Sequence, residues 1–185
     1  MDIVVATNNP NKLKEMRVCL EDKFDNILSL KDVSLDIEIE ETGTTFLENA
    51  IIKASTISKL TNLPAIADDS GLMVDALDGD PGVFSARYAG DPCNDKNNNE
   101  KLLKELEAKG AINKEDRSAK YVSCIVLQYP DGTFISGEGE CKGYILDHYE
   151  GTGGFGYDPL FYSIDLNKTF AQITLEEKNT VSHRA

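Results

Sequence analysis

The chain has 185 residues, of which 41% are hydrophobic and 28% charged, with a formal net charge of −13. This length predicts one domain, residues 1–185, that buries a sizeable core. The acidic balance excludes a nucleic-acid partner, because binding that backbone needs a basic face. No apolar run approaches the roughly 20 residues of a membrane span, and the N-terminus lacks the basic segment of a signal peptide, so we expect a cytoplasmic protein with no membrane partner. The four cysteines form no C-x-x-C pair and there are two histidines, so we expect reduced thiols rather than a zinc site.

The N-terminal segment predicts a strand, a polar turn and a helix. Residues 3–6 are apolar, residues 7–11 read Thr-Asn-Asn-Pro-Asn, and from Lys12 apolar side chains recur at helical spacing. A strand, a tight polar loop and a helix N-terminus offer N–H groups and a positive dipole end to phosphate. The loop lacks the Gly-Lys-Ser/Thr of a Walker A sequence. A plain turn with a solvated Lys12 explains the segment equally well.

The next segment predicts a second strand and a second helix. Residues 37–40 alternate Ile and Glu, as a strand does. Thr45 and Glu48 form a T-x-x-E capping box at the start of the helix. The apolar stripe of this helix consists of Phe46, Ala50, Ala54, Ile57 and Leu60. Asn49 and Lys53 lie four residues apart on another face, where they could act together, although we expect this face to be solvated.

Two adjacent carboxylates follow a short apolar run. Residues 65–72 read Ala-Ile-Ala-Asp-Asp-Ser-Gly-Leu, which predicts a buried strand that ends at Asp68 and Asp69. Successive side chains on a strand point to opposite faces, so the two carboxylates cannot share one partner. One could hold a metal ion or a water while the other fixes the backbone, at the strand end where α/β sheets bind ligands. Taken alone, such a pair is more often a solvated turn.

The second half of the chain predicts a helix and a hairpin. Residues 91–99 are polar and indicate a mobile loop, and residues 100–109 carry leucines at helical spacing before Gly110. Residues 119–129 and 133–145 are rich in strand formers on either side of Pro-Asp-Gly, which predicts an antiparallel hairpin.

The C-terminal part begins with a glycine-dense loop at residues 151–159 that carries two aromatic residues and one acid. A short strand is predicted at residues 160–162. Thr174 and Glu177 predict the cap of a last helical turn that holds Lys178. The elements together predict one mixed α/β domain with a central sheet and an antiparallel extension.

Seven blocks of the sequence resemble the inosine triphosphate pyrophosphatase family, also called XTP/dITP diphosphatases. They are, in the family's order, Thr7-Asn8-Asn9-Pro10-Asn11-Lys12, Glu40-Glu41-Thr42-Gly43, Phe46-Leu47-Glu48-Asn49-Ala50, Ile66-Ala67-Asp68-Asp69-Ser70-Gly71-Leu72, Pro81-Gly82-Val83-Phe84-Ser85-Ala86-Arg87-Tyr88, Gly153-Gly154-Phe155-Gly156-Tyr157-Asp158-Pro159, and Glu177-Lys178 with Ser182-His183-Arg184. Each block alone is weak, but seven in order span nearly the whole chain.

The resemblance implies an α/β fold with an elongated mixed β-sheet flanked by helices, and two lobes with a central cleft. It implies a homodimer that needs Mg²⁺, with Mn²⁺ as a possible substitute. The implied reaction hydrolyses ITP, dITP and XTP to the monophosphate and pyrophosphate, which removes these non-standard purine nucleotides from the pool. Family members continue past the Ser-His-Arg block into a further helix, whereas this sequence stops at Ala185, which leaves open how His183 and Arg184 are anchored.

The resemblance also assigns roles at the phosphate end of the substrate. Glu40 and Asp69 match the metal ligands and Asp69 also matches the proton acceptor, although Glu41 could replace Glu40 after a shift of one residue. Cleavage needs charge neutralisation, an oriented water and a proton acceptor, and Mg²⁺ needs only one or two carboxylates. Asp68 would support its neighbours, while Lys53 could contact phosphate or form a surface salt bridge, as could Arg87. The substrate-binding positions at this end are Thr7, Asn8, Asn9, Pro10, Asn11, Lys12, Ser70 and Lys178.

Recognition of the base is implied for Phe155, Gly156, Tyr157, Asp158, His183 and Arg184. Phe155 can stack on a purine, Asp158 can accept hydrogen bonds from it, and His183 and Arg184 can donate. Hypoxanthine and xanthine carry a carbonyl at C6 where adenine has an amino group, so an arginine there would reject adenine. Without the resemblance, the glycine-rich segment reads as a tight turn with core aromatics.

Two other functions stay open from the sequence. One is a non-catalytic sensor that only binds damaged nucleotides, although such a protein gains little from two metal-binding acids. The other is a Maf-type nucleotide pyrophosphatase that acts on modified or pyrimidine nucleotides. The sequence does not rank ITP, dITP and XTP.

Overall fold

A computed structural model describes residues 1–184 and divides the chain into two compact units. Unit 1 comprises residues 1–69 and 123–138, and unit 2 comprises residues 70–122 and those from 139 onward. The prediction of a single domain and that of a cleft between two lobes both stay predictions.

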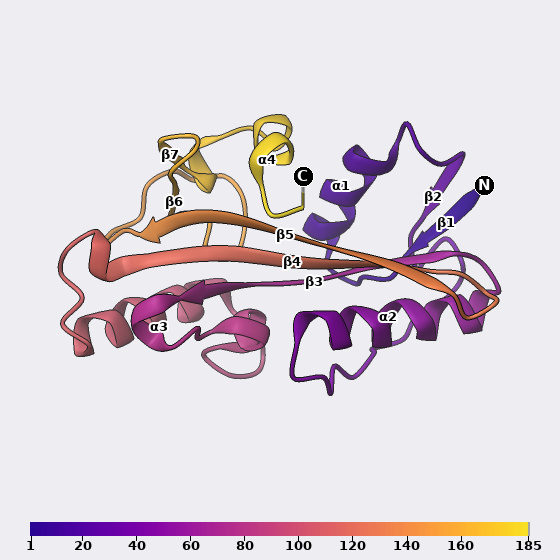
Figure 1. The fold of residues 1–185 in the computed structure, drawn as a ribbon, viewed down its shortest axis with the longest axis horizontal. Coiled ribbons are helices and arrows are strands. Elements are labelled where there is room, and N and C mark those ends of the chain that lie inside the picture. Colours follow the sequence, from indigo (N-terminus) through magenta and orange to yellow (C-terminus); the bar gives the residue numbers. More distant parts are fainter. Residues whose placement is uncertain (185) are drawn as a thin grey trace. The chain divides into compact units, whose positions relative to one another are not determined.

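The helices and strands form a mixed α/β fold (Figure 1). The helices are α1 (Pro10–Leu20), α2 (Phe46–Thr61), α3 (Asp95–Ala108) and α4 (Leu175–Val181). The strands are β1 (Asp2–Val5), β2 (Asn26–Leu28), β3 (Ala65–Val74), β4 (Ser118–Gln128), β5 (Phe134–Ile145), β6 (Phe161–Ser163) and β7 (Lys168–Thr169). They form one seven-stranded sheet in the order β2-β1-β3-β4-β5-β6-β7, with parallel pairs at β1 and antiparallel pairs at β6. This confirms the predicted fold class, and β4 and β5 confirm the hairpin. Within residues 1–184, no helix has the length and apolar character needed to cross a bilayer.

Unit 1 has a helix on each face of its strands (Figure 1). Alternate side chains of β1 face opposite ways, so Ile3 and Val5 pack with Met16 of α1 while Val4 packs with Ala54 of α2. Burial of each aliphatic side chain of this size stabilises the fold by about 1.5–3 kcal/mol. Because both faces are covered, residues 3–5 of the strand are apolar and buried, as predicted.

The predicted strand at residues 37–40 is wrong. Ile37 and Ile39 are half-buried against the core that α2 covers, and Glu38 and Glu40 are exposed, but this segment pairs with no strand in the described part of the chain. The alternation arises because an extended segment lies along an apolar surface, which does not require a neighbouring strand.

Helix α2 has the predicted capping box, but the burial of three of its side chains differs from the prediction. Thr45 Oγ1 accepts from the Glu48 N–H at 3.2 Å, and the Glu48 carboxylate accepts from the Thr45 N–H at 3.2 Å. Leu60, predicted in the apolar stripe, is 58% exposed because it lies in the last turn, beyond the core. Asn49 and Lys53, predicted to be solvated, are buried because both bind polar groups of neighbouring segments.

The sequence predicted that this strand ends at its two aspartates, but β3 continues to Val74. Leu72 and Val74 are fully buried in the core of unit 2, so apolar contacts extend the strand beyond the acidic pair. Asp68 and Asp69 therefore lie in the middle of a strand, where both are buried.

Unit 2 buries an apolar core to which α3 contributes Leu102 and Leu106. The helix begins at Asp95, well before residue 100, and Asn94 caps it by accepting from the Asn97 N–H at 2.9 Å. The mobile loop predicted at residues 91–99 is therefore wrong for its second half. An Asn N-cap satisfies a free N–H group at a helix start, and here the polar composition hid that signal.

The C-terminal elements agree with the sequence. The predicted short strand is β6, which pairs with β5 through Tyr144 and Tyr162. Helix α4 starts with the predicted box, in which Thr174 Oγ1 accepts from the Glu177 N–H at 3.1 Å and the Glu177 carboxylate accepts from the Thr174 N–H at 2.8 Å. The two-residue strand β7 was too short to predict.

Candidate functional site

Two neighbouring aspartates of β3 each meet a lysine from a different helix. Lys12 of α1 lies 3.0 Å from Asp68 Oδ2, and Lys53 of α2 lies 3.2 Å from Asp69 Oδ1. Successive strand side chains point to opposite faces, and α1 and α2 cover opposite faces. The sequence thus places one cation against each carboxylate. Asp68 also accepts a hydrogen bond from Ser123 of β4.

Lys53 is the buried centre of a polar cluster. Its ammonium donates to Glu41 Oε1 at 3.2 Å, to Asp69 Oδ1 at 3.2 Å and to the Asp68 carbonyl at 2.9 Å. Its side chain is 10% exposed. One cation therefore holds together two carboxylates that would otherwise repel each other.

The second carboxylate oxygen of Asp69 is the most unusual atom of this cluster. Oδ2 is buried and has no hydrogen-bond partner among residues 1–184, which is rare for a buried acceptor. Burial raises the pKa of Asp69, and the charge of Glu41 adds to this rise, while Lys53 and Lys12 oppose it. A raised pKa makes a carboxylate a better proton acceptor near neutral pH.

Of the two candidate glutamates, Glu41 is the one beside this cluster. It pairs with Lys53, whereas Glu40 is exposed. The described residues hold no group of three or more His, Cys, Asp or Glu side chains placed to bind a metal ion. Mg²⁺, however, uses one or two carboxylates together with waters and substrate phosphates. Asp69 and Glu41, which share Lys53 as a partner, fit such a partial site.

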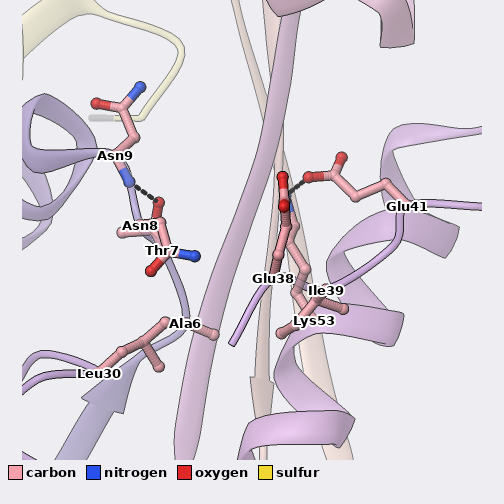
Figure 2. A pocket seen from close by; sticks show the side chains of 9 residues that line it. All are labelled: Ala6, Thr7, Asn8, Asn9, Leu30, Glu38, Ile39, Glu41 and Lys53. Carbon is pink, nitrogen blue, oxygen red and sulfur yellow. Dashed lines mark hydrogen bonds and ion pairs between the residues drawn. The ribbon is translucent and has the colours of Figure 1, made fainter. Parts of the chain in front are cut away.

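A pocket with a volume of about 200 Å³ lies beside the cluster. Figure 2 shows the start of the N-terminal polar loop along one wall and Glu41 with Lys53 along the other. Asn8 Nδ2 donates to the Ile37 carbonyl at 2.9 Å, which ties the polar loop to the extended segment. The lining residues are Ala6, Thr7, Asn8, Asn9, Leu30, Glu38, Ile39, Glu41 and Lys53. Of the six residues predicted to bind substrate at positions 7–12, the structure thus brings residues 7–9 into one pocket with two carboxylates and an ammonium.

The N-terminus of α1 is capped by its own sequence. The helix begins at Pro10 rather than Lys12, and Asn9 Oδ1 accepts from the N–H groups of Asn11 at 2.9 Å and Lys12 at 3.3 Å. Thr7 Oγ1 accepts from the Asn9 N–H at 3.1 Å. Phosphate could therefore take these N–H groups only by replacing side-chain oxygens.

In unit 2, the residues implied in base recognition gather around a buried ion pair. Lys178 Nζ lies 2.9 Å from Asp158 Oδ2, and the two side chains are 5% and 3% exposed. Asp158 also accepts from the Phe155 N–H at 3.0 Å and from the Tyr121 hydroxyl at 3.4 Å. A side chain at Gly154, where φ is +71°, would collide with Asp158. The glycine-rich loop is thus wrapped around this carboxylate, and Lys178 lies with the base-reading residues.

The open question of how the Ser-His-Arg block is anchored has an answer within unit 2. The His183 ring stacks on Tyr121, with ring centroids 4.8 Å apart and planes at 14°. Arg184 Nη2 donates to Ser70 Oγ at 2.6 Å. A Cβ at Gly139 of β5 would collide with the His183 carbonyl, so the strand approaches this block closely. Both His183 and Arg184 are buried by these contacts.

Sequence reasoning missed Tyr121, which belongs to the cluster around Asp158. Tyr121 is buried, and its hydroxyl keeps its proton because burial and the neighbouring Asp158 raise its pKa. Tyr157, for which the resemblance implied a role in base recognition, donates its hydroxyl to the Ser85 carbonyl at 2.7 Å. No local pattern marked Tyr121, since an aromatic residue in a strand is ordinarily a core residue. The guanidinium carbon of Arg87, a candidate for a phosphate contact or a surface salt bridge, lies 5.2 Å from the centroid of the Phe84 ring.

Comparison with known sequences gives one consistent result. A sequence model of the Ham1 family matches residues 3–185. A protein of Bacillus licheniformis named dITP/XTP pyrophosphatase is 49% identical over 184 residues, which cover 100% of this chain and 92% of that protein. A protein of Haemophilus influenzae with the same name is 51% identical over 185 residues, covering 99% of this chain and 93% of that protein.

Solved structures resemble the chain over the same length. A HAM1 protein from Coxiella burnetii superposes with a TM-score of 0.87 at 42% identity, covering 100% of this chain and 92% of that one. A nucleoside-triphosphatase, also named dITP/XTP pyrophosphatase, from Mycobacterium abscessus gives a TM-score of 0.78 at 44% identity, covering 100% and 95%.

Proposed function

Because the chain belongs to the Ham1 family, we propose that it hydrolyses dITP, XTP and ITP to the monophosphate and pyrophosphate. It is a hydrolase acting on phosphoric anhydrides, and the hydrolysis would remove these non-standard purine triphosphates from the nucleotide pool. The observation that carries the proposal is the cluster of buried Asp69 and Lys53 with half-buried Glu41, beside a pocket lined by the polar loop. A protein that only binds nucleotides has no need for a buried carboxylate with a raised pKa.

Asp69 is the proposed proton acceptor. Transfer of a phosphoryl group needs little covalent help, but it needs an oriented water, an acceptor for its proton and neutralisation of the phosphate charge. Oδ1 of Asp69 is held by Lys53, while Oδ2 has no donor among the described residues and is the oxygen that would take the proton. Lys12 and Lys53 supply positive charge on the two faces of β3.

We further propose that Mg²⁺ takes part. Glu41 and Asp69 would hold it, with Glu40 as the alternative that the family resemblance suggests. When bound, the ion would neutralise phosphate oxygens and orient the attacking water. Mn²⁺, which also accepts oxygen ligands, is a possible substitute.

The base would be read by the cluster of unit 2. Arg184 and His183 carry donors for the carbonyl of hypoxanthine or xanthine, and Phe155 offers a ring for stacking. Asp158 is bound by Lys178, so it would read the base only by sharing or exchanging this partner. Arg184 would be held in place by its hydrogen bond to Ser70 of β3. From the family resemblance we also propose a homodimer in the cytoplasm.

Pyrophosphate release measured across a panel of nucleotides tests this function. We expect rapid release from ITP, dITP and XTP with Mg²⁺, little release from ATP and GTP, and none in EDTA. A preference for modified or pyrimidine nucleotides would instead indicate a Maf-type enzyme. Tight binding of ITP without pyrophosphate release would indicate a sensor. Either result would overturn the proposal.

A further inference from the structure

The first turns of α3 bind the backbone of the glycine-rich loop. The N–H of Gly156 donates to Asp95 Oδ2 at 2.9 Å, and Asn99 Nδ2 donates to the carbonyl of Gly156 at 3.0 Å. Asp95 and Asn99 lie one helical turn apart and so share a face of α3. Two side chains of one helix face thus fix the two peptide groups that flank Gly156.

The residue before Asn99 binds a second segment of unit 2. Asn98 Oδ1 accepts from the Ala89 N–H at 2.7 Å, and Asn98 Nδ2 donates to the Ala86 carbonyl at 2.8 Å. The adjacent carbonyl, that of Ser85, accepts from the hydroxyl of Tyr157 at 2.7 Å. The glycine-rich loop and residues 85–89 are therefore joined twice, once through α3 and once directly, in a closed circuit of hydrogen bonds.

Burial strengthens the contacts of the two asparagines, whereas the contact of Asp95 is exposed. Asn98 and Asn99 are 2% and 4% exposed, and Asn99 Oδ1 has no hydrogen-bond partner within residues 1–184. A buried amide with one unpaired end is costly, so packing alone does not explain an asparagine here. The hydrogen bond from the Asn99 amide nitrogen to the Gly156 carbonyl does explain it. At Gly156, φ is +59° and nothing lies within 4 Å of the position of a Cβ, so side-chain packing does not hold this residue.

We propose that Asp95 and Asn99 are positioning residues that set base selectivity by fixing the peptide groups around Gly156. This inference rests on the proposed function, in which Phe155 and Asp158, on either side of Gly156, meet the purine. The Phe155 N–H also binds Asp158, so rotation of the peptide groups at Gly156 would move both the stacking ring and the carboxylate. The proposed proton acceptor, Asp69, belongs to unit 1 and has no part in this circuit. Loss of either side chain should therefore weaken binding of the preferred base more than the chemical step.

Single substitutions in α3 test the proposal against a matched control. Asn99→Ala removes the donor to Gly156, and Asp95→Ala removes the acceptor. Asn97→Ala is the control, because Asn97 is exposed on the same helix and its backbone, not its side chain, binds Asn94. Alanine has a higher helix propensity than asparagine, so neither asparagine variant should weaken the helix itself. Asp95→Asn keeps an oxygen acceptor and should rescue the effect of Asp95→Ala.

We expect Asn99→Ala to raise the KM for ITP about tenfold, the size of one buried hydrogen bond. Asp95→Ala removes an exposed hydrogen bond and should raise the KM by a smaller factor. The kcat for ITP and the kcat/KM for ATP should change little, so the ITP/ATP ratio of kcat/KM falls. Asn97→Ala and Asp95→Asn should resemble wild type. Hydrogen exchange of residues 153–158 should speed up in Asn99→Ala but not in Asn97→Ala.

Several results would overturn the proposal. One is an ITP/ATP ratio in both alanine variants that matches Asn97→Ala, and another is a fall in kcat alone. If Asn99→Ala does not fold, as judged by its melting temperature, the comparison of Asp95→Ala with Asp95→Asn decides. Failure of the proposed function is distinct from these results, because it would appear as wild-type protein that releases no pyrophosphate from ITP.

Discussion

The ammonium nitrogen of Lys53 lies 3.2 Å from Oδ1 of Asp69, with side chains that are 10% and 7% exposed. An ion pair at this depth is a weak source of stability, because desolvation of two charges offsets their attraction. The raised pKa of Asp69 indicates that burial outweighs the attraction of Lys53 here. A carboxylate kept in such a place is better explained by chemistry than by stability.

Asp69→Asn should lower kcat by about 10² to 10⁴-fold, the usual contribution of a general base. Asparagine has the same size but cannot accept the proton, so binding of ITP, measured by calorimetry, should persist. The matched control is Asp68→Asn, the same change on the opposite face of β3, where Lys12 is the partner. That variant should retain far more turnover. Equal losses in the two variants would contradict the assignment of Asp69 as the base.

Asp69→Asn should also change how the free energy of unfolding depends on pH. Because the pKa of Asp69 is raised from 3.8 in the folded state, the native protein holds this proton more tightly than the unfolded chain. Wild type therefore loses stability as pH rises from 3.8 through the raised pKa. Asparagine cannot ionise, so in EDTA the melting temperature of Asp69→Asn should exceed that of wild type at pH 7. The expected difference is about 2–4 °C for each kcal/mol of unfolding free energy that ionisation of Asp69 costs the wild type. The difference should shrink toward pH 3.

Added Mg²⁺ gives this experiment a second arm. If Asp69 binds the ion, Mg²⁺ should raise the melting temperature of wild type and leave that of Asp69→Asn unchanged. A variant that is less stable than wild type at pH 7 in EDTA, or an equal response of both proteins to Mg²⁺, would refute the account.

The opposite orientation of Asp68 and Asp69 was predictable because side-chain alternation is a local rule. The continuation of β3 was not, because Ser70 reads as the start of a turn while the buried position of Val74 depends on the distant core of unit 2. Lys53 was misjudged for a related reason. A helical pattern shows which face is polar, but not that Asp69 from another element meets that face.

Local features were predictable where a residue type in a given spacing has one common structural role. The capping boxes were read correctly from spacing alone, as at Thr45. Asn99 was not found, since a run of asparagines has the composition of a loop and only the fold places its amide on Gly156. Polar residues that bind backbone groups far along the chain leave no periodic signal in the sequence.

Gly43→Ala should displace the segment that carries Glu41. The Gly43 N–H donates to Asn49 Oδ1 at 2.8 Å, and a Cβ at this glycine would lie 2.6 Å from the same oxygen. Overpacking of this kind costs about 1–3 kcal/mol of unfolding free energy. The Mg²⁺ concentration for half-maximal activity should rise as well, because Glu41 moves away from Asp69. Gly137→Ala is the control, since nothing lies within 4 Å of its Cβ position, and equal effects in the two variants would contradict the prediction.

Lys178→Met should destabilise the protein by about 3–5 kcal/mol, because it leaves the buried carboxylate of Asp158 without its ammonium partner. Adding Asp158→Asn removes the stranded charge, so the double variant should recover part of the loss in urea unfolding. The exposed pair of Lys142 and Glu140 provides the control, and Lys142→Met should change stability by less than about 1 kcal/mol. A double variant less stable than Lys178→Met would indicate that the carboxylate is satisfied without the lysine.

Arg184→Ala should narrow the preference for ITP over ATP. The guanidinium offers donors that suit the C6 carbonyl of hypoxanthine and oppose the amino group of adenine, so its removal should lower kcat/KM for ITP and spare that for ATP. One charged hydrogen bond corresponds to a fall of about 10 to 100-fold in the ratio. Ser70→Ala separates recognition from anchoring, because it removes the hydroxyl 2.6 Å from Arg184 Nη2 and keeps the guanidinium. We expect a smaller fall in that variant, and an unchanged ITP/ATP ratio in Arg184→Ala would remove Arg184 from base recognition.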